Sequence, residues 1–346
     1  MEDGVRSTPD RESSRSARRA RTLIVSLSYP AEEGDPSGHF VRTEALDLVR
    51  AGEDVHVIAP RVTAGDSARY RSSALGGDAL FRWPGAIARA RANPLRLAAI
   101  PGVALRVRRA IARAGRFDRV RLHWLVPTAW PLTPAFPGAD VEATAHGADV
   151  RMLLAAPMRA RERILTAILD RGARIRFVAH ALLDALADGL AGVTRARLVA
   201  RARVEPMALE SMDHVAPRDA RGGYVVWVGR DIPSKRLDVA LDACARAGRR
   251  LVVVGAARAA RDGVRFLGKV PRDEALAWIA GADALLSTSL AEGAPTSVRE
   301  ARAIGVPVIA CPAGDLARWA ESDGGIAIAP IDAAGIGALV GRPLPL

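Results

Sequence analysis

Cysteine is scarce in this chain of 346 residues, which contains only Cys244 and Cys311. They lie far apart and without the spacing of a zinc site, which excludes a disulfide framework and favours a reducing compartment. No apolar run approaches the roughly 20 residues that a membrane-spanning helix needs. Residues 1–20 are polar and lack the apolar centre of a secretory signal, so we predict a disordered tail. These absences together predict a cytoplasmic protein.

Aromatic residues and lysine are also scarce. Phe, Trp and Tyr make up 4% of the chain and no nucleic-acid recognition motif occurs, which argues against specific nucleic-acid binding despite a net charge of +12. The charge comes mostly from arginine, which together with abundant alanine suggests a GC-rich genome. With 49% hydrophobic and 25% charged residues, the chain is expected to be globular. Its length fits two domains of common size.

Positive charge is concentrated between Arg82 and Arg121, where eleven arginines accompany one acidic residue, Asp118. Pro94 and Pro101 are expected to divide this segment into short helices. Two interpretations remain open. The arginines either solvate ordinary surface helices, or they form an interfacial patch that binds anionic lipid on the inner face of the cell membrane.

Strands and helices are predicted to alternate along the chain. Residues 22–28 and 54–60 are apolar runs of strand length, and residues 41–51 between them have apolar positions at helical spacing. This opening predicts a parallel sheet with right-handed crossovers. Gly34 and Gly38, after the first strand, permit close approach of the backbone to a ligand. A second sheet is predicted to begin at residues 224–229.

Two glutamates, Glu292 and Glu300, stand eight positions apart in the stretch AEGAPTSVREARAIGVPVIA at residues 291–310. The preceding apolar run, residues 282–287, predicts a buried parallel strand. Glu292 therefore lies at the carboxyl end of a strand, where open α/β sheets bind their ligands.

A helix is predicted after this turn. Pro295 fits its first position, where a missing N–H costs nothing, and Thr296 and Ser297 are polar residues suited to its opening turn. Free N–H groups and the positive end of the helix dipole make an anion site there. Glu300 lies about one turn deeper, close enough to accept a hydrogen bond from a sugar or ribose hydroxyl beside that anion.

The stretch resembles the E-x7-E signature of retaining glycosyltransferases of family four, which have the α/β GT-B fold of two Rossmann-like domains facing an interdomain cleft. The resemblance covers residues 22–330. It implies an N-terminal acceptor-binding domain at 21–205, a linker at 206–223, a C-terminal nucleotide-sugar-binding domain at 224–330, and a tail or short helix at 331–346.

Further motifs carry this resemblance. His146-Gly147-x-Asp149 resembles the family's H-G-x-D loop, whose histidine contacts the donor sugar. The run RDIPSK after the strand at 224–229 supplies Arg230 and Lys235, which by the family's pattern hold the donor diphosphate. The remaining donor-binding positions that the resemblance implies are Gly38, Gly229, Val270, Pro295, Thr296 and Ser297.

The resemblance also implies roles for the two glutamates, and the chain departs from the family at other positions. Glu292 would orient hydroxyls of the donor sugar near the reacting carbon, and Glu300 would bind the ribose. His180 stands where the family usually has serine, and Ala208 and Glu210 replace the glycine and aspartate of the family's hinge. These departures leave a role for His180 and the shape of the hinge undefined.

The function implied is transfer of a sugar, with retention, from a UDP-, GDP- or ADP-linked donor to a saccharide, lipid-linked or small-molecule acceptor in cell-envelope or glycoconjugate biosynthesis. No Asp-x-Asp occurs, so neither a metal nor another cofactor is expected; arginine, lysine and the helix N-terminus would neutralise the diphosphate instead. Two alternatives remain: a non-catalytic nucleotide-sugar-binding protein, and a basic nucleic-acid-binding protein.

Overall fold

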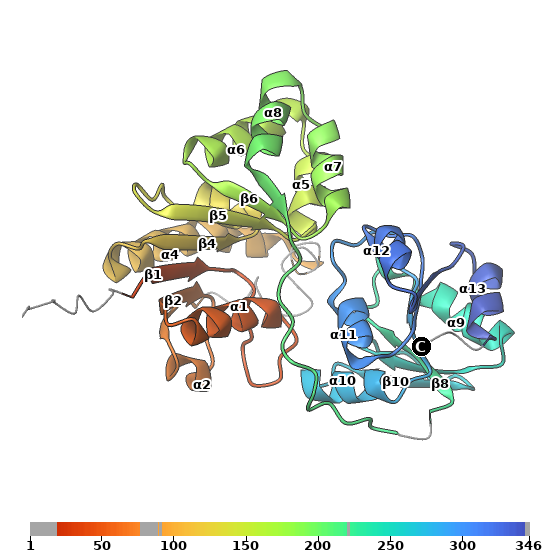
Figure 1. The fold of residues 1–346 in the computed structure, drawn as a ribbon. Helices are drawn as coiled ribbons and strands as arrows, with labels where there is room; N and C mark the ends of the chain where they lie inside the picture. Colours follow the sequence, from red (N-terminus) through yellow and green to blue (C-terminus); the bar gives the residue numbers. More distant parts are fainter. Residues whose placement is uncertain (1–18, 77–88, 90–91, 220–221, 343–346) are drawn as a thin grey trace, which may run out of the picture.

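The computed structural model describes residues 19–76, 89, 92–219 and 222–342, which form two domains joined by an extended connection (Figure 1). Domain 1 contains the elements β1 to β7, and domain 2 contains β8 to α13. All paired strands in both sheets run parallel. Residues 1–18 of the tail predicted at 1–20, and the end at 343–346, lie outside the described residues.

The sheet of domain 1 has the order β3-β2-β1-β4-β5-β6-β7. From β1 the chain adds strands first on one side and then, beginning with β4, on the other. Its strands are β1 (Arg21–Val25), β2 (Asp54–Ala59), β3 (Arg71–Ala74), β4 (Arg119–His123), β5 (Asp140–Ala145), β6 (Arg174–Phe177) and β7 (Ala202–Val204). The helices of this domain are α1 (His39–Arg50), α2 (Ala64–Ser67), α4 (Ile100–Ala114), α5 (Ala148–Ala155), α6 (Met158–Asp170), α7 (His180–Asp188) and α8 (Gly192–Arg201).

The sheet of domain 2 has the order β10-β9-β8-β11-β12-β13. Its strands are β8 (Tyr224–Val228), β9 (Arg250–Val254), β10 (Val264–Gly268), β11 (Ala284–Ser287), β12 (Val308–Ala310) and β13 (Ile326–Ile328). Its helices are α9 (Leu237–Arg246), α10 (Arg272–Ala280), α11 (Thr296–Ile304), α12 (Leu316–Ser322) and α13 (Ala333–Val340), the last of which packs on α9.

Each sheet is covered by apolar side chains on both faces, because successive residues of a strand point to opposite sides. In β1, Leu23 and Val25 belong to one buried cluster and Ile24 to another. In β8, the neighbours Tyr224 and Val225 likewise belong to two different buried clusters, one on each face of the sheet. This arrangement leaves the carboxyl ends of the strands as the edge where polar loops gather.

Several predicted boundaries were wrong in detail. The first strand ends at Val25 rather than at residue 28, because the Ser26 hydroxyl donates a 2.6 Å hydrogen bond to the carbonyl of Ser28 and the chain turns. Pro101 does not break a helix: it lies in the first turn of the 15-residue α4, where its missing N–H is tolerated. Pro295 is not the first helical residue but the extended residue before α11, which begins at Thr296.

The basic segment is described only in part, because residues 77–88 and 90–91 lie outside the described ranges. In α4, Val103, Val107 and Ile111 are buried against domain 1. The arginines that lie on the other side of the helix are exposed: Arg106, Arg108, Arg109 and Arg113. This amphipathic pattern is compatible with both interpretations of the segment. In the part of the chain that the structure describes, no helix is both long enough and apolar enough to span a bilayer.

Candidate active site

Two loops of domain 1 are tied together by the carboxylate of Asp149, which is fully buried. It accepts a 2.8 Å hydrogen bond from the backbone N–H of Leu125, after β4, and bonds of 2.9–3.0 Å from His146, Gly147 and Val150, after β5. Burial raises the pKa of Asp149, and the four N–H groups act against that rise. The H-G-x-D motif therefore fixes its own loop and the neighbouring one.

The His146 ring lies among other rings at the carboxyl ends of β4 and β5. Its centroid is 4.7 Å from that of Trp124, 4.9 Å from Phe40 and 5.3 Å from His123. Burial, followed by the neighbouring His123 ring and the cation of Arg176, holds the pKa of His146 well below its usual range. His146 is therefore a neutral imidazole at neutral pH.

The loop of His146 meets the Glu292 turn of domain 2. A β-carbon placed on Gly293 would lie 3.2 Å from the carbonyl oxygen of His146 and 3.1 Å from side-chain carbons of Val178 and Leu182. Only a glycine allows this approach without displacement of its neighbours. The structure thus brings together two motifs that lie almost 150 positions apart in the sequence.

Lys235 forms an ion pair with Glu292. Its loop is held by Thr288, whose buried hydroxyl donates to the carbonyls of Lys235 and Arg236 at 2.8 and 3.0 Å and accepts a 3.1 Å bond from the indole of Trp227. The segments that follow β8 and β11 are therefore fixed to each other. This contact places the lysine of one loop against the glutamate of the next.

Arg230 and Arg151 add positive charge around Glu292. Burial lowers the pKa of Arg230; Glu292 acts against this shift, and the cation of Arg151, from α5 of domain 1, adds to it. Lys235 and Arg230 of domain 2 thus interact with one carboxylate near the N-terminus of α11, and Arg151 of domain 1 acts on Arg230. Such an excess of positive charge suits a phosphate or diphosphate.

Glu300 is also buried, with an exposed fraction of 7%. Its Oε1 atom accepts a 2.7 Å bond from Arg272 and lies 3.6 Å from Nε2 of His39 in domain 1. Burial lowers the pKa of His39, while Glu300 acts to raise it. Arg272 also donates from its backbone to Gly34 and from its side chain to Glu210. Glu300 consequently takes part in a contact between the domains.

The remaining predicted positions occupy the same edges of the two sheets. Gly38 has φ of +69°, and a β-carbon there would lie 2.4 Å from the carbonyl oxygen of Ser28, so its close backbone approach is to the protein itself. Gly229 follows β8 and donates to the carbonyl of Val254. Val270 packs on an apolar cluster of domain 2. Pro295 is buried, and Thr296 and Ser297 are half-buried in the first turn of α11.

Sequence reasoning did not select Arg151, Arg272 or Asp315. Arg151 follows the H-G-x-D motif by two positions, and this spacing was the only available signal. Arg272 and Asp315 contact domain 1 from the start of α10 and from the residue before α12. Nothing local in either sequence segment indicates a contact with residues more than 60 positions away.

Comparison with solved structures places this architecture among known folds. The chain superimposes on sucrose-phosphate synthase from Thermosynechococcus elongatus over 93% of its own length and 89% of that chain, with a TM-score of 0.69 at 18% identity. The chain also matches an Escherichia coli structure described as trehalose-6-phosphate bound with UDP-2-fluoro glucose, and Anabaena HepE in complex with UDP and glucose. The chain has the GT-B fold.

The E. coli structure matches this GT-B chain over 94% of its length and 91% of the other chain, with 14% identity and a TM-score of 0.64. The match to Anabaena HepE covers 93% of this chain and 89% of the other, with 13% identity and a TM-score of 0.61. Residues 222–342, which are domain 2, match the family Glycosyl transferases group 1. No curated protein matches the sequence.

Proposed function

We propose that the protein is a retaining glycosyltransferase of family four that transfers a hexosyl group from a nucleotide sugar. The observation that carries this proposal is the pairing of Lys235 with Glu292 in a GT-B fold, beside Arg230 of domain 2, on which Arg151 of domain 1 also acts. The match of domain 2 to group 1 glycosyl transferases supports it. The UDP and UDP-2-fluoro glucose bound in two structures of similar fold support a nucleotide-sugar donor.

The proposed reaction exchanges one bond at the anomeric carbon for another on the same face. The bond to the diphosphate oxygen breaks, a bond to the acceptor hydroxyl forms, and the hydroxyl proton passes to the departing phosphate. Arg230, Lys235 and the N-terminus of α11 stabilise the negative charge that develops on the diphosphate. These fixed charges do the work for which other glycosyltransferases use a metal, so we propose that transfer is metal-independent.

Glu292 has two partners in succession under this proposal. Before the donor binds, its carboxylate neutralises Lys235. When a diphosphate takes over the lysine, Glu292 is left to accept hydrogen bonds from hydroxyls of the donor sugar, and His146 contacts the same sugar from domain 1. Glu300 binds the ribose through the oxygen that Arg272 does not occupy.

The proposal for the acceptor concerns the domain to which it binds and its chemical class. We propose a cytoplasmic enzyme whose acceptor, a saccharide, a lipid-linked sugar or a small molecule of envelope or glycoconjugate biosynthesis, binds mainly to domain 1. The amphipathic α4, with its exposed arginines, would hold the enzyme on an anionic membrane surface in the lipid-linked case.

A thermal-shift screen against UDP, GDP, ADP and their sugar conjugates tests the donor, since a ligand at 100 times its Kd adds about 2.7 kcal/mol of stability. The best donor is then incubated with candidate acceptors, and proton NMR follows the anomeric configuration of the first product. We expect retained configuration and activity that EDTA leaves unchanged. Binding of no nucleotide contradicts the proposal, and inverted product contradicts its stereochemistry.

A further inference from the structure

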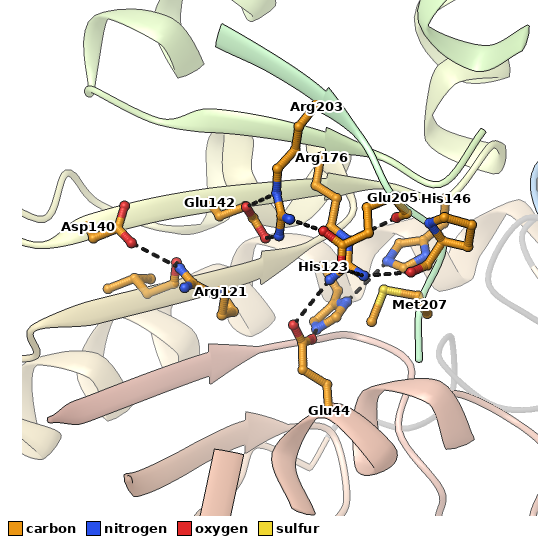
Figure 2. Close-up of polar contacts among 12 residues, drawn as sticks. Glu44, Arg121, His123, Asp140, Glu142, His146, Arg176, Arg203, Glu205 and Met207 are labelled. Carbon is orange, nitrogen blue, oxygen red and sulfur yellow. Dashed lines mark hydrogen bonds and ion pairs between the residues drawn. The ribbon is translucent and has the colours of Figure 1, made fainter. Parts of the chain in front are cut away.

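Three side chains form a series that begins in α1 and ends at the His146 loop (Figure 2). Oε2 of Glu44 lies 2.9 Å from Nε2 of His123, and Nδ1 of His123 lies 3.1 Å from Nε2 of His146. His123 closes β4 and has an exposed fraction of 0%. Both of its ring nitrogens therefore face protein partners, one a carboxylate and the other an imidazole.

Glu44 is a carboxylate in this environment. Burial alone would raise its pKa, but His123, Arg176 and Arg121 hold the pKa below its usual value. Nη1 of Arg176 lies 3.5 Å from Oε1 of Glu44, so the second oxygen, Oε2, is the one that faces His123. Neither Oε2 of Glu44 nor Nε2 of His123 has a hydrogen-bond partner among the described residues, so the 2.9 Å contact between them is the one polar contact that either atom makes there. A carboxylate oxygen cannot donate, so this contact favours a proton of His123 on Nε2.

Each buried carboxylate around His123 also has an arginine partner. Arg176 lies 3.5 Å from Glu44 and pairs with Glu205 as well, and the other buried carboxylate of this group, Glu142, accepts two bonds from Arg203 at 2.7 and 2.9 Å. A second proton on a fully buried ring would add an unbalanced cation, which is costly. With His123 neutral, its Nδ1 is an acceptor, and the 3.1 Å contact requires the proton to come from Nε2 of His146.

One nitrogen of His146 remains after this contact. The neutral ring has a single proton, which the series places on Nε2, so Nδ1 keeps its lone pair. The described residues offer Nδ1 no hydrogen-bond partner. Nδ1 is nevertheless not one of the buried polar atoms that lack a partner, so it is accessible to solvent. The same loop packs against Gly293, next to Glu292.

We propose that Glu44 is a positioning residue: through His123 it fixes His146 in the tautomer protonated on Nε2, so that Nδ1 accepts a hydrogen bond from a hydroxyl of the bound sugar. This inference rests on the proposed function for the identity of the ligand. Its first part, the position of the proton on each of the two imidazole rings, is a property of the protein alone.

Glu44→Gln reverses the series in a predictable way. Arg176 can only donate, so the amide oxygen of the glutamine faces the arginine and the amide NH₂ faces Nε2 of His123. His123 must then accept at Nε2 and carry its proton on Nδ1, from which it donates to Nε2 of His146. His146 is left with its proton on Nδ1, and its open nitrogen changes from an acceptor into a donor.

The tautomers are measured directly from the ring ¹⁵N shifts of protein labelled on histidine, at pH 7.5, where the six histidines of the chain give few signals. The His146→Gln and His123→Phe variants identify the two signals by their loss. We expect Nε2 to be protonated and Nδ1 unprotonated in both His123 and His146 of the native protein. We expect both assignments to exchange in Glu44→Gln.

Glu142→Gln is the matched control, because it removes the charge of a neighbouring buried carboxylate that bonds to Arg203 and not to His123. It should leave both tautomers unchanged. His146 protonated on Nδ1 in the native protein overturns the proposal, as does an equal change in both glutamine variants. Should Glu44→Gln fail to fold, the native spectrum and His123→Phe, which should release His146 from a single tautomer, still decide.

Kinetics separate this inference from the proposed function. Glu44→Gln should lower kcat by roughly tenfold, the effect of one misdirected hydrogen bond, and leave the Kd for the nucleoside diphosphate unchanged. A fall in kcat with unchanged tautomers contradicts the positioning role. The expected tautomers in a protein that transfers no sugar would instead contradict the proposed function and leave the hydrogen-bond series standing.

Discussion

Asp315 of domain 2 caps a helix of domain 1, and its replacement should weaken the association of the two domains. Its carboxylate accepts bonds of 2.6 and 2.8 Å from the backbone N–H groups of His180 and Ala181, which open α7. The helix has no side-chain cap of its own, since the residue before it is Ala179. Asp315 is itself buried, with an exposed fraction of 5%.

The size of the effect follows from these contacts. A hydrogen bond to a charged group contributes about 1.5–3 kcal/mol, and a negative charge at a helix N-terminus about 0.3–1 kcal/mol. Because such terms are not additive, we take about 2–3 kcal/mol for Asp315→Ala, which shifts the ratio of associated to separated domains by roughly 30–150-fold. Asp315→Asn keeps one acceptor oxygen and should cost about 1 kcal/mol, or roughly fivefold.

Distances between spin labels measure this shift. Cysteines introduced at the exposed positions Ala196 of α8 and Ala245 of α9 report on the two domains, while the native Cys244 and Cys311 are buried. We expect a new, broader distance population in the alanine variant and an intermediate one in the asparagine variant.

The control is Asp332→Ala, because Asp332 caps α13 within domain 2 by accepting a 2.8 Å bond from the N–H of Gly335. It should lower the stability of domain 2 without changing the distance between the domains. An unchanged distance in Asp315→Ala refutes the reasoning, and so does an equal change in both alanine variants.

Three other predictions concern charge. Lys235→Ala should weaken nucleoside diphosphate binding at least about tenfold in calorimetry with the fold intact; unchanged affinity removes the lysine from the site. Glu300→Gln should weaken binding of donor and diphosphate alike, whereas Glu292→Gln should lower turnover without loss of diphosphate affinity, because it removes a competitor for Lys235; the opposite pattern means that the roles are reversed. Burial acts to raise the pKa of Asp35, but backbone bonds and the ion pair with Lys269 hold it lowered. The ionised carboxylate therefore stabilises the fold above its unfolded pKa of about 3.9, and this stabilisation is lost as the pH falls through the lower folded pKa. Asp35→Asn should accordingly make the free energy of unfolding, measured with urea, depend less on pH in this acidic range.

The fold was predictable because its signals are local. Buried strands such as β8 and β11 are continuous apolar runs, and each is followed by glycine, proline or polar residues at the carboxyl end. The predicted GT-B fold, with two parallel sheets, is confirmed. The predicted boundaries were wrong where a single contact overrides the local pattern. At Ser26, for example, the hydrogen bond from the hydroxyl to the carbonyl of Ser28 accompanies the turn that ends β1 early.

The site was predictable only where its residues stand in motifs. His146, Lys235 and Glu292 follow strands, and the structure brings their loops together, although their roles stay predictions. The cap of α7 shows why the remainder was missed. The sequence left the role of His180 open, and the acceptor for its backbone N–H comes from Asp315, 135 positions away. Nothing in the local sequence around α7 indicates which distant residue supplies this cap.

The start of the connection between the domains, residues 205–207, is bonded to arginines of both domains. Arg176 of domain 1 donates to the carbonyls of Glu205 and Pro206. Arg299, next to Glu300 in domain 2, donates a 2.6 Å bond to the carbonyl of Met207. The side chain of Met207 is nevertheless buried in the apolar cluster of domain 1, so residues 205–207 are held by contacts to both domains. Rotation of domain 2 about this segment would have to break the Arg299 contact or withdraw Met207 from that cluster. Arg176 also faces Glu44, so the side chain that holds this segment is the one that orients the first member of the series leading to His146.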